Sequence, residues 1–210
     1  MFNPSKVLVL APHTDDGEIG CGGTIARLIA QGAQVHYMVF SMCEKSLPTG
    51  FAPGTLKQEV KEATKQLGIS EERLHIFDYP VRKFDSYRQD ILENLIKFGS
   101  DHDIDMVFAP SVNDVHQDHS VIANEAIRAF KHKTIMAFEM PWNNLTFETS
   151  GFFVLSEEDV DKKLHALDVY ESQKGRAYFT QDFIKSLLMV RGAQIKAKYA
   201  EAFDVVRFIS

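Results

Sequence analysis

The sequence predicts an α/β fold, in which a mostly parallel sheet carries helices on both of its faces. Short apolar runs alternate with longer segments of helical periodicity along most of the 210 residues. Such alternation is typical of right-handed strand–helix–strand crossovers, which build parallel sheets. The length suits one domain with a sizeable core, and neither a repeat nor a linker is visible. We therefore expect a single domain over residues 1–210.

The apolar runs are short, as strands are, and are bounded by polar or turn-forming residues. The first of them, KVLVLA at residues 6–11, is almost continuously apolar, which indicates a strand buried on both faces of the sheet. The other expected strands span residues 35–42, 74–79, 105–111, 134–142, 151–156 and 202–209.

The segments between these runs carry helical signals. TLKQEVKEATKQLG at residues 55–68 places its apolar residues on one stripe and ends at a glycine, as amphipathic helices do. SEED at residues 156–159 fits a capping box at the start of a helix that runs through Glu171. The remaining helices are expected at residues 22–32, 87–99, 118–131 and 180–194.

Polar clusters follow the first and the fourth expected strand. VLVLAPHTDDGEIGCGG, at residues 7–23, passes from an apolar run directly into an imidazole and three carboxylates, and NDVHQDH follows at residues 113–119. Parallel α/β sheets bind ligands outside the carboxyl ends of their strands. The two clusters are therefore expected to meet at one edge of the sheet, where they bring together three His and four Asp.

Each cluster alone has an ordinary explanation as a polar turn or a helix N-terminus, where the helix dipole favours an acidic residue. Together they fit a metal centre, because a catalytic zinc typically takes three imidazole or carboxylate ligands and keeps a water position. A carboxylate left over beside the metal fits a general base, and a remaining His fits a group that stabilises charge on a carbonyl oxygen. The residues alone do not choose between Asp15 and Asp16 as the ligand.

The paired motifs carry a family resemblance. APHTDDGEIGCGG at residues 11–23, together with DVHQDH at residues 114–119, resembles the motifs of the PIG-L/LmbE-type N-acetylglucosaminyl deacetylases. The segment QEVKEATKQLGI also resembles the second helix of that family, and the likeness extends from residue 6 to about residue 130. The resemblance implies a Rossmann-like α/β fold and a metal-dependent hydrolase, usually with zinc and with Fe²⁺ or another divalent ion as the alternative.

The resemblance also implies roles for residues of the two motifs. His13, Asp16 and His119 would be the metal ligands, and Asp15 would be the general base that activates the bound water. His116 would stabilise the tetrahedral oxyanion in its protonated form.

The resemblance also implies a role for Asp118, and the first motif departs from the family pattern at two positions. Asp118 would orient His116. Thr14 stands where the family usually has proline, and Gly17 stands where it usually has glutamate, with Glu18 next to it. The anchoring role of that glutamate is thus either lost or taken by Glu18. The three glycines that follow are expected to let the chain turn tightly into its helix.

Three residues outside the motifs are candidates for substrate binding. Arg82 follows the third expected strand and could reach a phosphate or carboxylate. Trp142 ends another strand and could stack on a sugar ring, with Asn143 or Asn144 bonding hydroxyl groups. Lys57 is the cation nearest to the place where the family often has an arginine for substrate.

Composition narrows the range of partners. The net charge of -6 argues against nucleic acid, which requires a basic face. No apolar run approaches the ~20 residues that span a bilayer, and the N-terminus does not resemble a signal peptide. The two cysteines form no disulfide framework, which favours a cytoplasmic location. We expect a small-molecule partner, an N-acetylated amino sugar or its conjugate; assembly into a homo-oligomer is left open.

The expected function is the metal-dependent removal of an N-acetyl group from an amino sugar of the GlcNAc type. Two alternatives remain: an N-acyl amide hydrolase for a substrate that is not a sugar, and a non-catalytic metal-binding relative. A nucleotide-binding oxidoreductase is disfavoured, because GCGGTIA lacks the G-x-G-x-x-G spacing that such a site needs.

Overall fold

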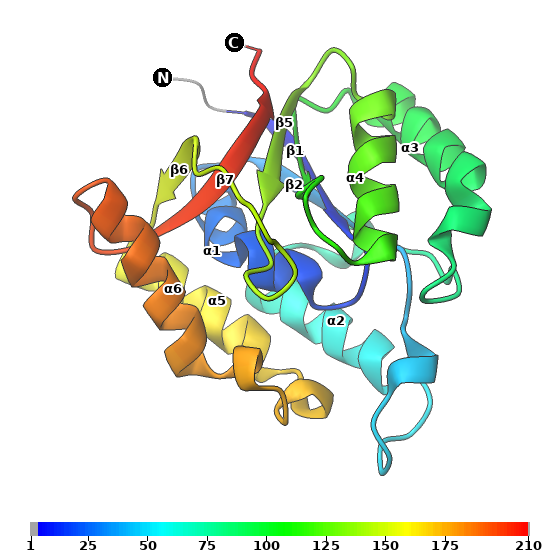
Figure 1. Cartoon of the computed structure of the whole chain (residues 1–210), viewed down its shortest axis with the longest axis horizontal. Helices are drawn as coiled ribbons and strands as arrows, with labels where there is room; N and C mark the ends of the chain where they lie inside the picture. Colours follow the sequence, from blue (N-terminus) through cyan, green and yellow to red (C-terminus); the bar gives the residue numbers. More distant parts are fainter. Residues whose placement is uncertain (1–3, 210) are drawn as a thin grey trace.

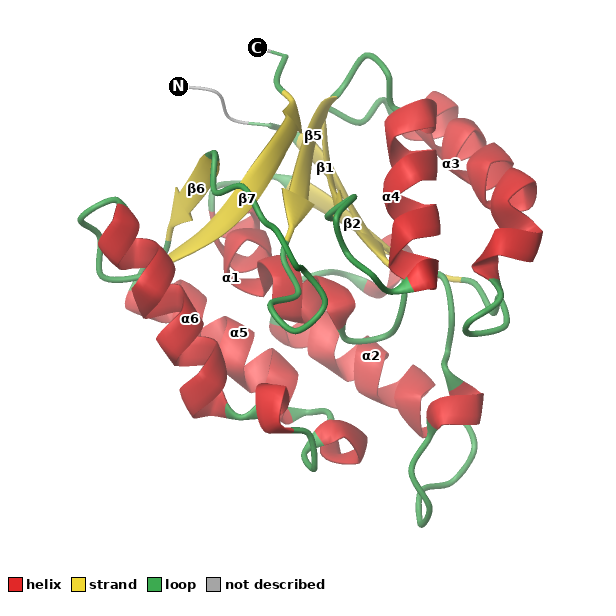
Figure 2. Ribbon diagram, viewed as in Figure 1, coloured by secondary structure: helices red, strands yellow, loops and turns green. Residues whose placement is uncertain are grey.

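The computed structural model describes residues 4–209, which build one seven-stranded sheet (Figures 1 and 2). The strand order is β3-β2-β1-β4-β5-β7-β6. Strands β1 to β5 run parallel, whereas β7 is antiparallel to both of its neighbours. This confirms the mostly parallel sheet. The strands are β1 (Lys6–Ala11), β2 (Gln34–Val39), β3 (Leu74–Ile76), β4 (Met106–Pro110), β5 (Thr134–Phe138), β6 (Gly151–Val154) and β7 (Ala200–Arg207).

Helices cover both faces of the sheet, as predicted (Figure 1). Successive side chains of a strand point to opposite faces, and β1 supplies both cores accordingly. Val7 and Val9 belong to the core on the side of α1, α2 and α5, whereas Leu8 and Leu10 belong to the core beneath α3 and α4. The helices are α1 (Asp16–Ala30), α2 (Thr55–Gln66), α3 (Arg88–His102), α4 (Gln117–Ala129), α5 (Glu157–Asp168) and α6 (Gln181–Gln194).

Some boundaries differ from those predicted from the sequence. Strand β2 ends at Val39 and β5 ends at Phe138, because the chain leaves the sheet there to form the loops at its carboxyl edge. The predicted capping box is confirmed: the Ser156 hydroxyl accepts from the Asp159 backbone N–H, and the Asp159 carboxylate accepts from the Ser156 backbone. Helix α5 nevertheless stops at Asp168, earlier than expected.

Helix α1 begins at Asp16 rather than at residue 22, so the three glycines lie inside the helix and do not form a turn before it. The helix is kinked at Cys21, which has φ -147° and ψ 23°. Gly20 and Gly23 serve close packing instead, since a Cβ atom at Gly20 would collide with the ring of Phe138 and one at Gly23 with Leu155.

A buried ion pair satisfies the backbone groups that the kink in α1 exposes. The Lys163 ammonium donates to the Ile19 carbonyl oxygen at 2.6 Å and pairs with Glu201 at 2.5 Å. The Glu201 carboxylate in turn accepts from the backbone N–H groups of Gly23, at 3.0 Å, and Thr24, at 2.7 Å. Buried backbone groups require such partners, so the pair stabilises the kinked geometry of α1.

The strand order places a topological switch point between β1 and β4. From β1 the chain proceeds outward to β2 and β3, and it then returns to continue on the other side through β4 and β5. A crevice opens at the carboxyl ends of the two strands on either side of such a point. The loops that carry the two polar motifs leave the sheet there. Among residues 4–209, none of the helices has the length and apolarity that crossing a bilayer would require.

Candidate active site

The motif side chains are carried by two helix starts. Asp16 opens α1, and its carboxylate accepts a hydrogen bond from the backbone N–H of His13 at 2.8 Å, which fixes the loop after β1. His116 is the N-cap of α4, because its Nδ1 accepts from the Asp118 backbone N–H at 3.2 Å. His119 lies in the first turn of α4, and its ring reaches His13 in the loop after β1.

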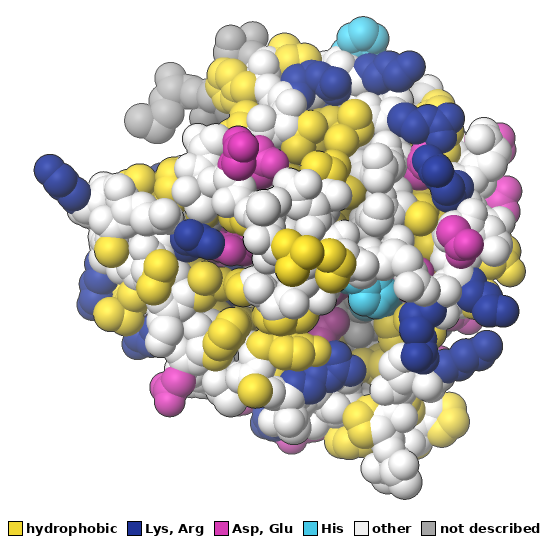
Figure 3. All heavy atoms as spheres, in the orientation of Figure 1, with side chains coloured by type: hydrophobic (Ala, Val, Ile, Leu, Met, Phe, Trp, Pro, Cys, Tyr) yellow, Lys and Arg dark blue, Asp and Glu magenta, His cyan; other side chains and the backbone are white. Residues whose placement is uncertain are grey.

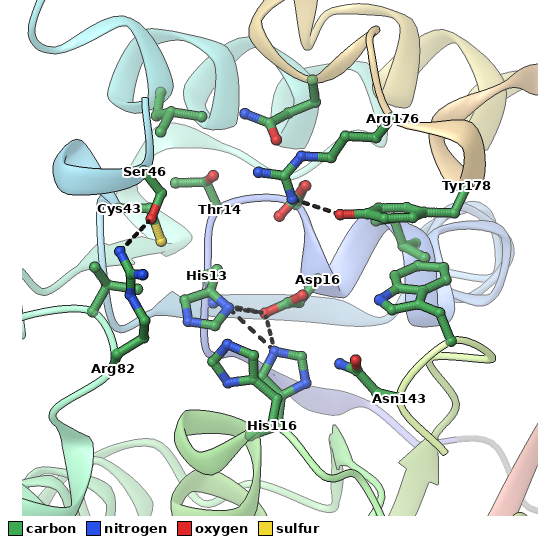
Figure 4. Close-up of a pocket in the computed structure, with 17 residues that line it drawn as sticks. His13, Thr14, Asp16, Cys43, Ser46, Arg82, His116, Asn143, Arg176 and Tyr178 are labelled. Carbon is green, nitrogen blue, oxygen red and sulfur yellow. Dashed lines mark hydrogen bonds and ion pairs between the residues drawn. The ribbon is translucent and has the colours of Figure 1, made fainter. Parts of the chain in front are cut away.

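The three residues expected to bind a metal converge on one point, and Figure 4 labels two of them, His13 and Asp16. Asp16 Oδ2 lies 3.1 Å from His13 Nδ1 and 3.1 Å from His119 Nε2, and these two nitrogen atoms are 3.2 Å apart. Zinc binds imidazole nitrogen and carboxylate oxygen at about 2.0–2.2 Å, so neighbouring ligands of one ion lie roughly 3–3.5 Å apart. The arrangement therefore fits a divalent ion held by one carboxylate and two imidazoles.

The outer nitrogen of each imidazole is held by a second carboxylate. His13 Nε2 lies 3.0 Å from Asp118 Oδ2, and His119 Nδ1 lies 2.7 Å from Asp114 Oδ2. Both aspartates are buried. Carboxylates in this position fix the ring and leave the inner nitrogen with its lone pair toward a metal.

The buried carboxylates around this centre also favour the binding of a cation. Although burial alone has the opposite effect, His119 and His13 hold the pKa of Asp16 well below its usual range. In the same way, Asp16 and Asp114 overcome the effect of burial and raise the pKa of His119 to about 10. Three buried carboxylates, those of Asp16, Asp114 and Asp118, lie within hydrogen-bond distance of the His13 and His119 rings, so positive charge between them is favoured.

His116 lies beside this centre and offers a third imidazole. One nitrogen from each of His13, His116 and His119 lies within 4.8 Å of the others, so His116 is an alternative or additional ligand. Burial, together with the two neighbouring imidazoles, lowers the pKa of His116. Because Nδ1 accepts the capping hydrogen bond, we assign the proton of the neutral ring to Nε2. The direction of this shift favours the neutral ring of His116 over the protonated one, and Nε2 can donate a hydrogen bond in either form.

The expected pairing of Asp118 with the His116 ring is also corrected. The Asp118 carboxylate bonds to His13 and accepts from the backbone N–H groups of Arg82, at 2.6 Å, and Phe84, at 3.3 Å. The hydrogen bond between Asp118 and the His116 ring comes from the Asp118 backbone N–H. Asp118 therefore orients His13 and ties the loop after β3 to α4.

Asp15 lines the same pocket next to Asp16. Burial and the neighbouring Asp16 carboxylate raise its pKa to about 6, and the positive charge of Arg176 opposes the shift. A carboxylate with such a pKa is suited to exchanging protons near neutral pH.

The pocket that contains these groups has a volume of about 340 Å³. One wall is aromatic: the rings of Trp142 and Tyr178 stack with centroids 3.8 Å apart and planes 17° apart. Asn143 lies beside this wall and faces the centre (Figure 4). The pocket thus combines a polar centre with an aromatic wall on which a ring-shaped ligand could stack.

Two of the three predicted substrate residues line the pocket, and one does not. Arg82 and Trp142 belong to its lining. Lys57 is exposed on α2 and lies outside the lining, to which its neighbour Leu56 contributes. The reason is the register of α2: Leu56 is buried facing the pocket, and the next residue therefore points to solvent.

Sequence reasoning missed Arg176, Tyr178 and the residue that positions them. These two residues follow α5 in a segment without a motif or a periodic pattern, so no local signal could have identified them. Glu59 on α2 is buried and accepts from the Ser172 backbone N–H at 2.9 Å and from its hydroxyl at 2.5 Å. This contact holds the segment that carries Arg176 and Tyr178 against α2.

This chain has Gly17 where the family usually has glutamate, and the neighbouring Glu18 anchors the first motif instead. Its buried carboxylate accepts from the hydroxyl groups of Tyr37 and Tyr170, and Tyr170 also donates to the Thr14 carbonyl. Burial raises the pKa of Glu18 to about 8. A side chain at position 17 would collide with the Tyr37 ring, because a Cβ atom there would lie 2.5 Å from the Tyr37 hydroxyl.

Comparison with known proteins identifies the family of this chain. A family model described as "PIG-L: GlcNAc-PI de-N-acetylase" matches residues 8–130. A protein of Escherichia coli (strain K12) described as "Uncharacterized deacetylase YaiS" is 28% identical over 177 residues, which cover 79% of this chain and 90% of that protein.

Solved structures share the fold over nearly the whole chain. N,N'-diacetylchitobiose deacetylase from Pyrococcus horikoshii superposes with a TM-score of 0.76 and 22% identity, covering 97% of this chain and 84% of that one. GalB, the 4-carboxy-2-hydroxymuconate hydratase from Pseudomonas putida KT2440, superposes with a TM-score of 0.81 and 21% identity, covering 98% of each chain. At these identities the similarity establishes a common fold, and the hydratase shows that this fold hosts more than one reaction.

Proposed function

Because this chain belongs to the PIG-L family, we propose that it is a metal-dependent hydrolase that removes an N-acetyl group from an amino sugar of the GlcNAc type or its conjugate. The observation that carries the proposal is the convergence of Asp16 with two imidazoles whose outer nitrogens are each held by a carboxylate. Asp15 remains in the same pocket, outside this set.

We assign the metal site to His13, Asp16 and His119, with zinc as the first choice of ion and Fe²⁺ as the alternative. When bound, such an ion supplies positive charge that polarises an amide carbonyl and acidifies water. The aromatic wall formed by Trp142 and Tyr178 suits the apolar face of a sugar ring.

The chain's own residues account for the proton transfers. Asp15 takes a proton from the attacking water as the water oxygen bonds to the amide carbon. His116 donates a hydrogen bond from Nε2 to the carbonyl oxygen, on which negative charge develops. Asp15 then returns its proton to the nitrogen as the C–N bond breaks, and acetate and an amine leave.

Acetate release from a panel of N-acetylated amino sugars, free and conjugated, tests the reaction. The wild-type protein should release acetate and retain about one divalent ion per chain. His13→Ala and His119→Ala should lose the metal and the activity together. His165→Ala is the matched control, because His165 is an exposed histidine on α5.

Other outcomes would favour the alternatives. Acetate release only from N-acylated compounds without a sugar would indicate the broader amide hydrolase. A metal-loaded protein that hydrolyses none of these compounds would indicate the non-catalytic relative. Full metal occupancy in both histidine variants, measured by elemental analysis, would overturn the ligand assignment.

A further inference from the structure

Gln173 is a buried glutamine in the lining of the pocket. It follows α5 in the same segment as Arg176 and Tyr178, and only 3% of its surface is exposed. Figure 3 shows a hollow on this face of the molecule in which histidine is visible, so a ligand can enter the pocket from this side. Glutamine is mostly exposed in proteins, and a buried side-chain amide requires partners for both its oxygen and its NH₂ group. The partners of the Gln173 amide therefore indicate what this part of the pocket can bind.

The amide of Gln173 is held in one orientation by Ser172 and Glu59. The Ser172 hydroxyl lies 2.5 Å from Glu59 Oε2 and donates its single proton to that carboxylate. It can therefore only accept the hydrogen bond from Gln173, whose Nε2 lies 2.9 Å away. Since the oxygen and nitrogen of an amide are assigned from such networks, this chain of hydrogen bonds assigns Nε2 to the side of Ser172.

The other atom of the amide, Oε1, accepts no hydrogen bond from any residue within 4–209. It is nevertheless not sealed in the interior, because the buried side-chain polar atoms without a partner in this range are Thr24 Oγ1 and Asn144 Nδ2. Gln173 lines the pocket, so its Oε1 is accessible from there. A fixed acceptor on a buried side chain is suited to bind a hydrogen-bond donor of a ligand.

The place of Gln173 in the fold indicates which donor this is. Its backbone N–H donates to the Tyr170 carbonyl and its own carbonyl accepts from the Arg176 N–H, both at 3.0 Å, and its amide is tied through Ser172 to Glu59 of α2. The centre to which we assign the metal is built instead by the starts of α1 and α4. The acetamide that is cleaved must lie at that centre, so the donor for Gln173 belongs to another part of the sugar, where the donors are hydroxyl groups.

We propose that Gln173 is a specificity-determining residue, whose Oε1 accepts a hydrogen bond from a hydroxyl group of the sugar. The inference rests on the deacetylase function proposed above, because the acetamide must occupy the centre while the hydroxyl group meets Gln173. A sugar without this hydroxyl leaves the acceptor unpaired, and a site built to pair with a substrate hydroxyl rejects an analogue that lacks it.

Kinetics on N-acetylglucosamine and its 3-deoxy, 4-deoxy and 6-deoxy derivatives tests the inference. With the wild-type protein, kcat/KM should fall by ~5–150-fold for one deoxy sugar, the effect of leaving a buried acceptor unpaired. Gln173→Met keeps the size of the side chain and removes the amide, so it should hydrolyse that deoxy sugar and N-acetylglucosamine with equal kcat/KM. A merely structural role would lower both values by one factor and preserve their ratio. Gln181→Met is the matched control, because Gln181 is exposed at the start of α6 and lies outside the lining.

Ser172→Ala provides a second test, which stands even if Gln173→Met does not fold. It keeps Gln173 but removes the hydroxyl that orients the amide, which can then turn its NH₂ group toward the pocket. The discrimination against the deoxy sugar should weaken, although no side chain that meets the sugar has changed. Undiminished discrimination would contradict the orientation on which the inference depends.

Equal kcat/KM for all four sugars in the wild-type protein would overturn the inference and leave the deacetylase function standing. Full discrimination by Gln173→Met would also overturn it. If N-acetylglucosamine is not hydrolysed, calorimetric titration of the zinc-loaded protein with the four sugars decides. A weaker affinity for one deoxy sugar, abolished as a difference in Gln173→Met, would support the contact without the proposed reaction. Equal affinities in the wild-type protein, a difference that persists in Gln173→Met, or no binding of any of the four sugars would overturn it.

Discussion

At the scale of residues, neighbouring aspartates in one loop have different surroundings. Asp16 lies between two imidazoles, which stabilise its charge, whereas Asp15 is buried next to another carboxylate, which destabilises its charge. The pKa of Asp16 is accordingly lowered and that of Asp15 raised to about 6. Adjacent carboxylates whose pKa values are pushed apart commonly divide the work of binding and proton transfer.

Asp15→Asn should separate these two tasks. Loss of a general base typically reduces the rate by ~10²–10⁴-fold, while the metal should stay bound because Asp16 is intact. Acetate release and elemental analysis measure the two properties on one preparation. Asp16→Asn is the matched variant and should lose metal first. Normal turnover by Asp15→Asn would mean that another group accepts the proton.

Asp114→Asn should weaken metal binding without removing a ligand. The Asp114 carboxylate lies 2.7 Å from His119 Nδ1 and also accepts from the His116 backbone N–H at 2.8 Å. Loss of such a partner typically reduces metal affinity by ~10–100-fold. Competition with a chelator would measure the change. An affinity equal to that of the wild-type protein would show that the Asp114 contact does not support the metal site.

At the scale of elements, α2 connects the pocket with the segment after α5. Leu56 lines the pocket, and Glu59, one turn further along, accepts two hydrogen bonds from Ser172. Arg176 and Tyr178 follow Ser172 closely in the chain. The aromatic wall therefore depends on the contact between α2 and the segment after α5 rather than on its own local structure.

Glu59→Ala should loosen this segment. The change leaves buried donors on Ser172 without a partner, which costs about 1–3 kcal/mol. We expect a lower free energy of unfolding, faster amide hydrogen exchange over residues 171–179 and a raised KM. Gln58→Ala is the control, since Gln58 is exposed on the same helix. Unchanged exchange in the segment after Glu59→Ala would contradict this role.

The kink in α1 likewise depends on side chains from other elements, because Lys163 and Glu201 bond to its backbone groups. Lys163→Met should destabilise the protein by about 3–5 kcal/mol, because it leaves the Glu201 charge buried without a partner. Adding Glu201→Gln to that variant should restore part of the loss. Urea unfolding of the wild-type protein, both single variants and the double variant measures the coupling. Additive losses would show that the two side chains act independently.

At the scale of the whole molecule, the strand order of the sheet determines where the candidate active site lies. The switch point between β1 and β4 brings together loops that are about a hundred residues apart in the chain. The first turns of α1 and α4 meet there through Asp16 and His119. The fold also assembles a second group of histidines, away from this site. His36 of β2 lies 3.2 Å from His75 of β3, measured from Nδ1 to Nε2, and its ring centroid is 4.8 Å from that of His102 at the end of α3.

This second group of histidines should lower the free energy of unfolding at acidic pH. Burial, then the positive charges of His102, His75, Arg73 and Lys6, lower the pKa of His36 to about 4. The unfolded chain binds a proton at His36 near pH 6.5 and the folded chain does not, so stability is lost as the pH falls from about 6.5 toward 4. One pKa unit corresponds to about 1.4 kcal/mol, and solvent screening reduces the effect, so we expect a loss of about 1–2 kcal/mol.

Urea unfolding at pH 7 and at pH 4.5 checks this prediction. His36→Gln should lose less stability between these pH values than the wild-type protein does. His132→Gln, at an exposed histidine, should behave like the wild-type protein. If His36→Gln retains the full acid sensitivity, the loss of stability arises from other groups.

The sequence by itself determined the alternation of strands and helices and the two motifs, because both are recorded locally. Hydrophobic periodicity follows from the faces that a strand or helix buries, and the motif residues lie within a few positions of one another. Only the tertiary structure decided which carboxylate serves which imidazole, that Glu18 anchors the first loop, and that Arg176 and Tyr178 reach the pocket. These contacts join distant segments, as in the bond from Tyr170 to Thr14, which lie 156 residues apart in the chain. Such contacts depend on how the elements pack, and no local pattern records them.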